Sequence, residues 1–195
     1  MNFPILSCVL LCPVIGLVLV LLTPRRFENA VRVISAISAA GSLVLSILVC
    51  FYFNAHDASF QMVERIEWVK SYGIHYSNAV DGLNVSMILL TSIVIFCGTL
   101  VSWTVTYRVK EFYANLLFLV SGVFGVFMTT NLFFFFLFYE IAVIPMYLLI
   151  VVWGSTNKQY AAMKLTLYLL LGSALMFAGF LFIYSLPGAR TFDLL

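Results

Sequence analysis

The chain has 195 residues, of which 64% are hydrophobic and 9% are charged, and its mean hydropathy is +1.11. Soluble domains carry about 25% charged and roughly 45–50% apolar residues, so the composition excludes an ordinary soluble protein. The formal net charge of +2 comes from 10 basic and 8 acidic residues, an excess too small for a nucleic-acid-binding surface. Disorder is excluded because disordered chains are poor in apolar residues. The composition therefore indicates an integral membrane protein that contacts the lipid bilayer.

The apolar residues form stretches long enough for membrane-spanning helices, each of which needs about 20 mostly apolar residues. None of the stretches alternates between apolar and polar residues as the strands of a membrane barrel do, so helices are expected. In chain order, the predicted helices cover residues 4–23, 30–53, 83–105, 113–130, 132–153 and 161–185. We predict an all-α membrane protein with six transmembrane helices in a single membrane domain, residues 1–195.

The positions of the positive charges predict the orientation of the chain. The residues before the first helix carry none, so this helix is not expected to be a signal peptide. Seven basic residues lie in or beside the odd-numbered connections: Arg25, Arg26, Arg32, Arg108, Lys110, Lys158 and Lys164. The other side collects three: Arg65, Lys70 and Arg190. Because cytoplasmic connections carry the excess of basic residues, we expect the odd-numbered connections in the cytoplasm, or its equivalent, and the N-terminus outside.

The connections and cysteines carry further expectations. Asp81 precedes the third helix and is placed to cap its free N–H groups. The connection 129–131 is so short that the fourth and fifth helices must form an antiparallel hairpin. His56 and His75 share the longest connection, 54–80, but ordinary loop residues are expected rather than a metal site, because no carboxylate stands at ligand spacing. Small buried hydrophobes, not disulfides or metal ligands, are expected for the four cysteines: Cys8, Cys12, Cys50 and Cys97.

Glu140 is an acid in the middle of the otherwise apolar helix 132–153. At a rise of 1.5 Å per residue it lies about 3 Å from the bilayer centre. An acid at that depth costs roughly 2.5–3.5 kcal/mol on insertion scales, and such residues usually serve a function. A carboxyl whose proton affinity changes as a cation approaches and retreats can take up and release a proton. Glu140 is therefore the candidate proton relay, and the alternative is an acid held protonated in helix packing.

Two residues near Glu140 support this reading. Pro145 has no N–H to donate to the carbonyl of Ile141, so a backbone acceptor is freed beside the acid. Such a break is tolerated where water or neighbouring helices satisfy the freed group. Tyr147 lies seven residues after Glu140, on the same helix face, and is a candidate hydrogen-bond partner along it.

Lys164 is the second candidate for a relay. It lies three residues inside the predicted sixth helix, about 5 Å deep, whereas Glu140 lies about 20 Å from the same surface. The separation in depth, roughly 15 Å, excludes a direct ion pair if both helices are straight. Because a lysine at this depth can extend its amine to the membrane surface, an interface anchor and a relay residue remain equal alternatives.

The chain carries no phosphate loop, dinucleotide fingerprint, haem attachment pair or nucleophile triad. Residues 131–154, which include Glu140 and the segment Ile144-Pro145-Met146-Tyr147, resemble the fifth helix of subunit M (mitochondrial subunit 4) of NADH-quinone oxidoreductase, complex I. Residues 79–84 and 161–165 add supporting matches, and the resemblance spans almost the whole chain. It is most specific at Glu140.

The resemblance implies a proton-translocating subunit of the membrane arm, in which the fifth-helix glutamate couples to lysines in later helices. Lys164 matches a sixth-helix lysine of the family. Family members have about fourteen helices in an antiporter-like arrangement, and this chain resembles the first six, so a truncated or split chain is expected. The resemblance places NADH, flavin, iron–sulfur clusters and quinone elsewhere in the complex, with no cofactor or metal bound by this chain.

The resemblance also implies partners and a location. The expected partners are other complex I membrane subunits, especially the antiporter-like subunits L and N, in a bacterial or mitochondrial inner membrane. The expected enzyme is a proton-translocating NADH:quinone oxidoreductase of the respiratory chain, in which quinone reduction drives proton transport. Two alternatives remain open: a subunit of a cation/proton antiporter, and a non-pumping structural membrane subunit.

Overall fold

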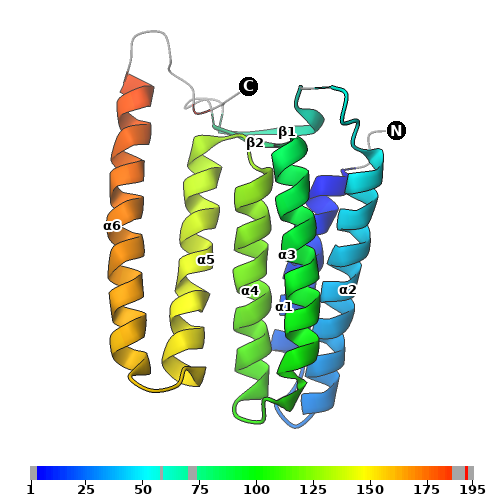
Figure 1. The fold of residues 1–195 in the computed structure, drawn as a ribbon, viewed down its shortest axis with the longest axis vertical. Coiled ribbons are helices and arrows are strands. Elements are labelled where there is room, and N and C mark those ends of the chain that lie inside the picture. Colours follow the sequence, from blue (N-terminus) through cyan, green and yellow to red (C-terminus); the bar gives the residue numbers. More distant parts are fainter. Residues whose placement is uncertain (1–3, 58, 70–73, 186–191, 193–195) are drawn as a thin grey trace.

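The computed structural model describes residues 4–57, 59–69, 74–185 and 192. In this part of the chain, six long helices lie side by side, with consecutive helices running in opposite directions (Figure 1). They are α1 (Ile5–Leu22), α2 (Glu28–Tyr52), α3 (Gly82–Val101), α4 (Val109–Met128), α5 (Leu132–Trp153) and α6 (Lys158–Ser185). Each is long and apolar enough to cross a membrane. The prediction of six spanning helices is confirmed, and the chain is an integral multi-pass membrane protein.

Three of the helices begin two or more residues earlier than their apolar stretches predicted. The α2, α4 and α6 helices begin at Glu28, Val109 and Lys158, because their first turns include polar residues that hydropathy alone excludes. Acids stand in the first turns of α2 and α4, Glu28 and Glu111, where they interact favourably with the positive end of the helix dipole. The third predicted helix ends in a short 3-10 turn, η2 (Ser102–Thr104).

Two side chains fix helix starts next to the short connections. The Asp81 carboxylate accepts a hydrogen bond from the Asn84 N–H at 2.8 Å, which confirms the predicted cap of α3. The Asn131 side-chain oxygen accepts from the N–H groups of Phe133 at 3.1 Å and Phe134 at 3.4 Å. Asn131 therefore lets the chain turn from α4 directly into α5, the predicted antiparallel hairpin.

The long connection between α2 and α3 contains a two-stranded antiparallel sheet that the sequence analysis missed. Its strands are β1 (Gln61–Val69) and β2 (Ile74–Val80), and they pair Glu64 with Asn78 and Ile66 with Tyr76. Both strands are rich in β-branched and aromatic residues, which favour strands. Two irregularities in the register interrupt the alternation of side chains, so the pattern typical of a strand is weak in the sequence.

The sheet covers one end of the helix bundle (Figure 1). The Glu64 carboxylate accepts hydrogen bonds from the Leu6 N–H at 2.9 Å and the Ser7 N–H at 3.1 Å, and from the Ser7 hydroxyl. It thereby satisfies N–H groups in the first turn of α1, whose preceding residue, Pro4, makes no side-chain cap. At the other strand, the Thr130 N–H donates to the Ser77 carbonyl at 2.8 Å. The sheet thus joins the start of α1 to the α4–α5 connection.

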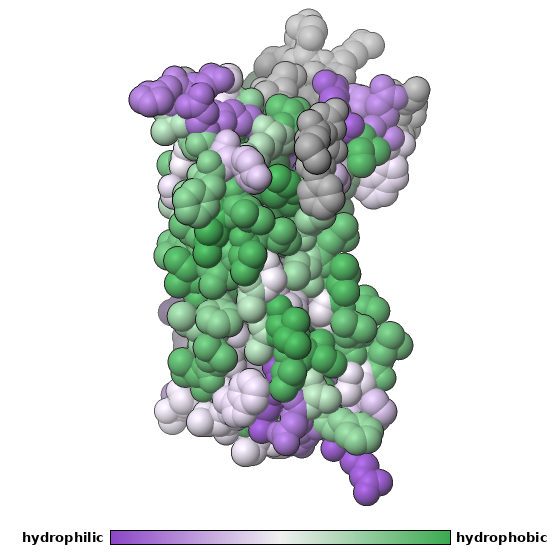
Figure 2. Space-filling model, turned by 90° about the vertical axis from the view of Figure 1, so that its right-hand side faces the viewer, coloured by the Kyte–Doolittle hydropathy of each residue, from purple (hydrophilic) through white to green (hydrophobic). Residues whose placement is uncertain are grey.

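The α4 helix lies at the centre of the packing and α6 at its edge (Figure 1). In the most apolar segment of each helix, 50% of the residues of α4 are buried but only 6% of those of α6. The face of the molecule seen in Figure 2 carries a broad hydrophobic band between more polar ends. Such a band is what a protein surrounded by lipid exposes, because the bilayer interior is as apolar as a protein core.

The cysteines correct one expectation. Cys8 and Cys12 are half-buried, and Cys50 and Cys97 are exposed, so none of the four is buried. In a membrane protein an apolar stretch does not distinguish the inside from the lipid-facing surface, and this is why the expectation was wrong. Of the basic residues that predict the orientation, Lys70 and Arg190 lie outside the described residues.

Candidate functional site

Glu140 lies where the sequence placed it, near the middle of α5. The observed bounds of this helix, Leu132–Trp153, are the predicted ones, and Glu140 lies about 4 Å along the axis from its midpoint. The side chain is half-buried. It is the only charged residue of the described helices that lies more than two turns from both helix ends.

The contacts of α5 show that Glu140 points away from α4. A Cβ atom added to Gly122 of α4 would lie 2.9 Å from the Phe138 carbonyl oxygen and 2.9 Å from the Ala142 nitrogen, so Phe138 and Ala142 mark the face that packs on α4. Glu140 is two residues from each, which is a rotation of about 200° around the helix axis. The carboxyl therefore belongs to the opposite face of α5.

That opposite face borders α6. The Phe136 ring, one turn before Glu140, packs against the Phe177 ring of α6 with centroids 4.8 Å apart. Val143, three residues after Glu140, is buried. Because residues three and four apart share a helix face, Glu140 lies on the stripe of α5 that runs beside α6.

Within the described part of the chain, no hydrogen bond or ion pair reaches the Glu140 carboxyl. Tyr147 lies about 11 Å further along the same stripe and makes no hydrogen bond with it. Pro145 is buried, and α5 continues through it, so the Ile141 carbonyl stands without the N–H that a different residue at position 145 would donate. The structure thus places a titratable group and a freed backbone acceptor one residue apart.

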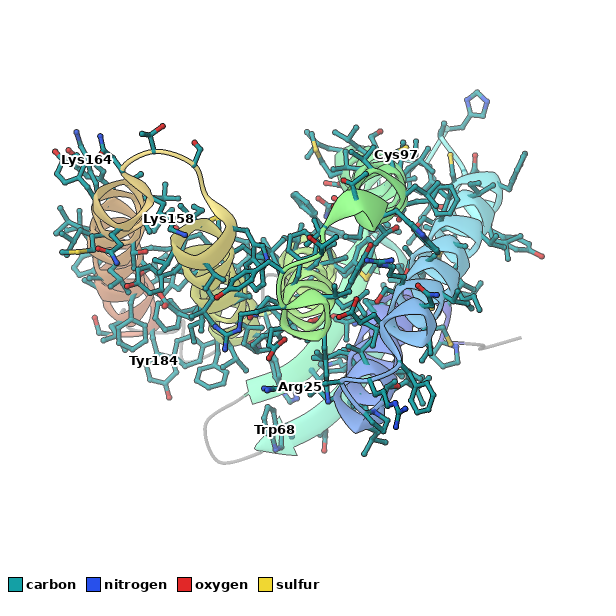
Figure 3. All side chains as sticks on the ribbon, turned by 90° about the horizontal axis from the view of Figure 1, so that it is seen from below. Arg25, Trp68, Cys97, Lys158, Lys164 and Tyr184 are labelled. Atoms are coloured by element: carbon teal, nitrogen blue, oxygen red, sulfur yellow. The ribbon has the colours of Figure 1, made fainter. Side chains whose placement is uncertain are left out.

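Lys164 lies on the face of α6 that points away from α5. The residues of α6 that pack toward α5 include Ala162, Ser173 and Phe177, and Lys164 is about 200° around the axis from Ala162. Its ammonium lies 5.9 Å from the centroid of the Tyr160 ring, at the outer edge of the bundle (Figure 3). The side chain is exposed.

The structure therefore does not bring Lys164 and Glu140 together. Because α6 begins at Lys158, Lys164 lies about 9 Å along the helix, and its separation from Glu140 along the axis falls to about 11 Å. The predicted absence of a direct pair is consistent with this geometry, although α6 begins earlier than expected.

The end of α5 is held by contacts that sequence reasoning did not assign. The Lys158 ammonium donates to the Val152 carbonyl at 2.8 Å, and the Trp153 indole N–H donates to the Tyr107 carbonyl at 2.8 Å. A Cβ atom at Gly154 would lie 2.3 Å from the Ile150 carbonyl oxygen, so only glycine fits this turn. These contacts fix the helix that carries Glu140.

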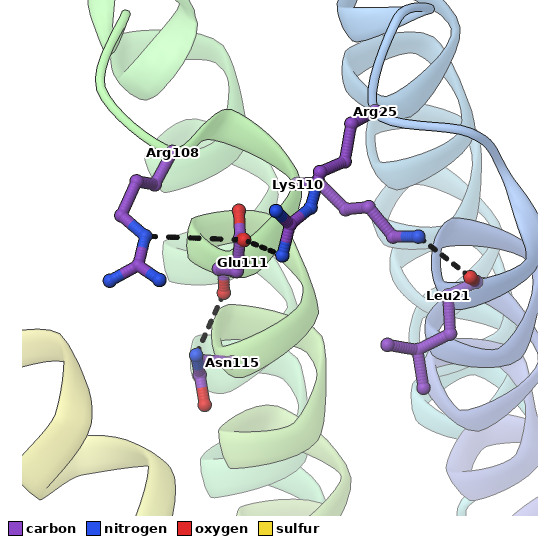
Figure 4. Close-up of polar contacts among 6 residues, drawn as sticks. All are labelled: Leu21, Arg25, Arg108, Lys110, Glu111 and Asn115. Carbon is purple, nitrogen blue, oxygen red and sulfur yellow. Dashed lines mark hydrogen bonds and ion pairs between the residues drawn. The ribbon is translucent and has the colours of Figure 1, made fainter.

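A cluster of charged residues lies at the end of the bundle where the odd-numbered connections are found. It consists of Arg25, Arg108 and Glu111 (Figure 4). The Arg25 guanidinium lies 2.8 Å from the Glu111 carboxylate, and the Arg108 guanidinium lies 4.0 Å from it. Arg25 follows α1 whereas Glu111 begins α4. Local sequence patterns cannot pair residues this far apart, and the excess of positive charge was the only signal.

Comparison with known proteins shows which family the C-terminal third of the chain matches. Residues 129–195 match the family described as "NADH:quinone oxidoreductase/Mrp antiporter, TM". This segment contains α5 and the whole of α6, and therefore both Glu140 and Lys164.

Curated relatives match over nearly the whole chain. The chain is 38% identical over 177 residues to the chloroplastic NAD(P)H-quinone oxidoreductase chain 4 of Chara vulgaris, covering 90% of this chain and 36% of the relative. It is 36% identical over 198 residues to an NAD(P)H-quinone oxidoreductase chain 4 of a Picosynechococcus species, covering 99% of this chain and 36% of the relative. The chain thus spans about a third of the length of the curated relatives it matches.

Solved structures share the fold. A chain of respiratory complex I from Thermus thermophilus with bound NADH superposes with a TM-score of 0.81 and 25% identity, covering 96% of this chain and 38% of that one. A chain of the Mrp complex from a Dietzia species superposes with a TM-score of 0.72 and 15% identity, covering 97% of this chain and 20% of that one. The second likeness shows the fold alone.

Proposed function

From the confirmed resemblance to the subunit M family, whose relatives are chain 4 of NAD(P)H-quinone oxidoreductases, we propose that this chain forms part of a proton-translocating membrane-arm subunit of complex I. In this proposal Glu140 takes up and releases the proton. The observation that carries the proposal is the position of Glu140, an acid at mid-depth on the α6-facing stripe of α5, within the residues that match the family.

The surroundings of Glu140 suit a group that exchanges protons. A mid-membrane acid is costly, and no partner among the described residues offsets its charge. A cation or water that approaches the carboxyl would stabilise its charged form. The half-buried side chain leaves room for such an approach from outside the six helices.

Lys164 is the secondary relay in this proposal. Its exposed ammonium stands on the outer face of α6, about 11 Å along the axis from Glu140. Proton transfer between them requires intervening water or side chains, because the distance is far longer than a hydrogen bond. We assign these to parts of the complete subunit that would cover the outer face of α6.

The remaining assignments follow the same proposal. The partners are other membrane subunits of the complex, with the antiporter-like subunits L and N foremost among them. The NADH, flavin, iron–sulfur clusters and quinone belong to other subunits, whose redox reaction drives proton transport here. The proposed location is a bacterial inner membrane or its mitochondrial counterpart.

Exchange of Glu140 tests the proposal in the complete complex, reconstituted in sealed vesicles. NADH oxidation and proton uptake are measured together, because a pump mutant lowers the number of protons moved per NADH. We expect Glu140→Gln, which keeps the size of the side chain but cannot ionise, to reduce proton uptake severely. Glu140→Asp, which keeps a carboxyl, should retain much more of it.

Two results would count against the proposal. Proton uptake at the wild-type level in Glu140→Gln would remove the relay role of this residue. Cation-driven proton movement in the absence of NADH and quinone would favour an antiporter subunit, the alternative with which the chain shares its fold.

A further inference from the structure

A groove of about 530 Å³ lies between α1 and α4, away from the Glu140 stripe. Its mouth lies at the connection between α1 and α2, which carries Arg25, at the end of the bundle that faces the viewer in Figure 3. The groove is lined by four apolar residues, Leu17, Leu21, Ala114 and Phe118, and by four polar ones, Arg25, Lys110, Glu111 and Asn115.

The lining changes from charged to apolar with depth. Lys110 and Glu111 stand in the first turn of α4, and Phe118 lies about two turns further along the same helix, about 12 Å deeper. On the other wall, Leu17 and Leu21 are one turn apart on α1. The charged mouth therefore lies at the end of the hydrophobic band, and the apolar depth lies within it, which is the arrangement of a phospholipid in a bilayer.

The charge at the mouth is positive. The groove and a smaller adjoining cavity of about 150 Å³ are bordered by three cations and two acids: Arg25, Arg108, Lys110, Glu28 and Glu111. The Lys110 ammonium is held there by donating to the Leu21 carbonyl at 2.8 Å. Arg25 is paired with Glu111, but its side chain is 78% exposed, so its remaining N–H groups are free to reach an anion (Figure 4).

We propose that this groove binds an anionic phospholipid. The headgroup phosphate is held by Arg25 and Lys110, and one acyl chain lies along Leu17 and Phe118. Basic pockets between membrane helices select anionic headgroups, because each cation near the surface favours them about fivefold. A zwitterionic lipid, whose headgroup carries its own cation, gains far less from the same site.

Photolabelling tests the site in the complete protein. The protein is reconstituted in phosphatidylcholine vesicles with a trace of phosphatidylglycerol that carries a photoreactive group in one acyl chain. Matched vesicles contain photoreactive phosphatidylcholine. The cross-linked peptides of α1 and α4 are quantified relative to those of α6, so that the general attraction of the membrane surface cancels. We expect phosphatidylglycerol to label the groove at least about fivefold more than phosphatidylcholine.

Three variants are expected to change the relative labelling by phosphatidylglycerol in different ways: one lowers it, one raises it and one leaves it unchanged. Arg25→Gln should lower the relative labelling by phosphatidylglycerol about fivefold, whereas Glu111→Gln should raise it, because the acid no longer competes for Arg25. Arg26→Gln is the matched control: this neighbouring arginine does not line the groove, and its loss should leave the ratio unchanged.

Four outcomes would overturn the proposal. They are equal labelling by the two lipids, a ratio that does not respond to Arg25→Gln, and displacement of the lipid by inorganic phosphate alone. The fourth is cross-linking of the groove to another polypeptide in place of lipid, which would identify the groove as a protein interface.

Discussion

At the scale of single residues, the depth and rotation of Glu140 decide what it can do. The residue lies within about 4 Å of the middle of α5 and points away from α4. A structural acid in a helix interface would have a partner in the neighbouring helix, because an unpaired polar group in lipid is costly. The described residues supply none, and this favours a group that gains and loses a proton.

The geometry of Lys164 predicts a weaker effect. Because Lys164 is exposed and makes no hydrogen bond or ion pair among the described residues, we expect Lys164→Ala to reduce proton uptake per NADH less than Glu140→Gln does. The same vesicle assay measures both. Lys164→Arg, which keeps the positive charge, is the control and should lie near wild type. A loss in Lys164→Ala as large as that in Glu140→Gln would contradict the secondary role.

At the scale of helices, close packing of α4 on α5 fixes the direction of Glu140. Gly122 brings the two backbones together, and a Cβ atom at Gly125 would lie 2.3 Å from the Phe138 ring. Small residues allow this approach in membranes, where packing rather than water exclusion joins helices. Any side chain at Gly122 must push α5 outward and carry Glu140 with it.

This packing predicts that Gly122→Ala destabilises the protein. A Cβ atom there meets backbone atoms that cannot move aside, and overpacking of this kind costs about 1–3 kcal/mol, against about 1 kcal/mol gained in helix propensity. Thermal unfolding of the purified protein should therefore shift to lower temperature. Gly98→Ala is the control, since nothing lies within 4 Å of its Cβ position. Equal midpoints for the two variants would refute the close approach.

Elements differed in how well the sequence predicted them, for physical reasons. The bounds of α5 were predicted correctly because the apolar stretch and the helix end at the same places. Asn131 and Gly154 stand directly before and after both. The starts of α2, α4 and α6 were misplaced because the first turn of each helix contains charged residues and therefore lies outside the apolar stretch from which the helix was predicted. The sheet was missed because its register irregularities break the strand pattern.

The same reasons apply to the site. Glu140 was predictable because a single charge inside an apolar helix is visible in the sequence alone. The groove between α1 and α4 was not, because Arg25 and Glu111 meet only through tertiary packing. Nor does the sequence alone show that Lys164 faces away from α5, since this depends on which face of α6 packs.

At the scale of the whole molecule, basic residues gather at one end of the bundle. The end of α1 and the start of α4 lie at the end of the bundle opposite the sheet (Figure 1), and Arg25 and Lys110 stand there. The acids Glu64 and Glu67 belong to the strand β1 of the sheet. This distribution predicts that the end without the sheet faces the cytoplasm or its equivalent, and that the N-terminus lies outside.

Thiol labelling checks this orientation. In a protein whose native cysteines are replaced, we expect an impermeant maleimide to label Thr156→Cys from the cytoplasmic side and Ala55→Cys from the other side. Both positions are exposed and lie at opposite ends of the bundle. Labelling from the reversed sides would show that the chain is inserted the other way round.

Infrared difference spectroscopy of the complete complex, recorded with and without NADH turnover, tests the central claim most directly. Protonation of a buried carboxyl produces a C=O band that a carboxylate lacks, and Glu140→Gln assigns the band by removing it. We predict a band that appears or disappears during turnover in the wild type and is absent from Glu140→Gln. A wild-type difference spectrum identical to that of Glu140→Gln would show that this carboxyl keeps its protonation state throughout, and would contradict the relay.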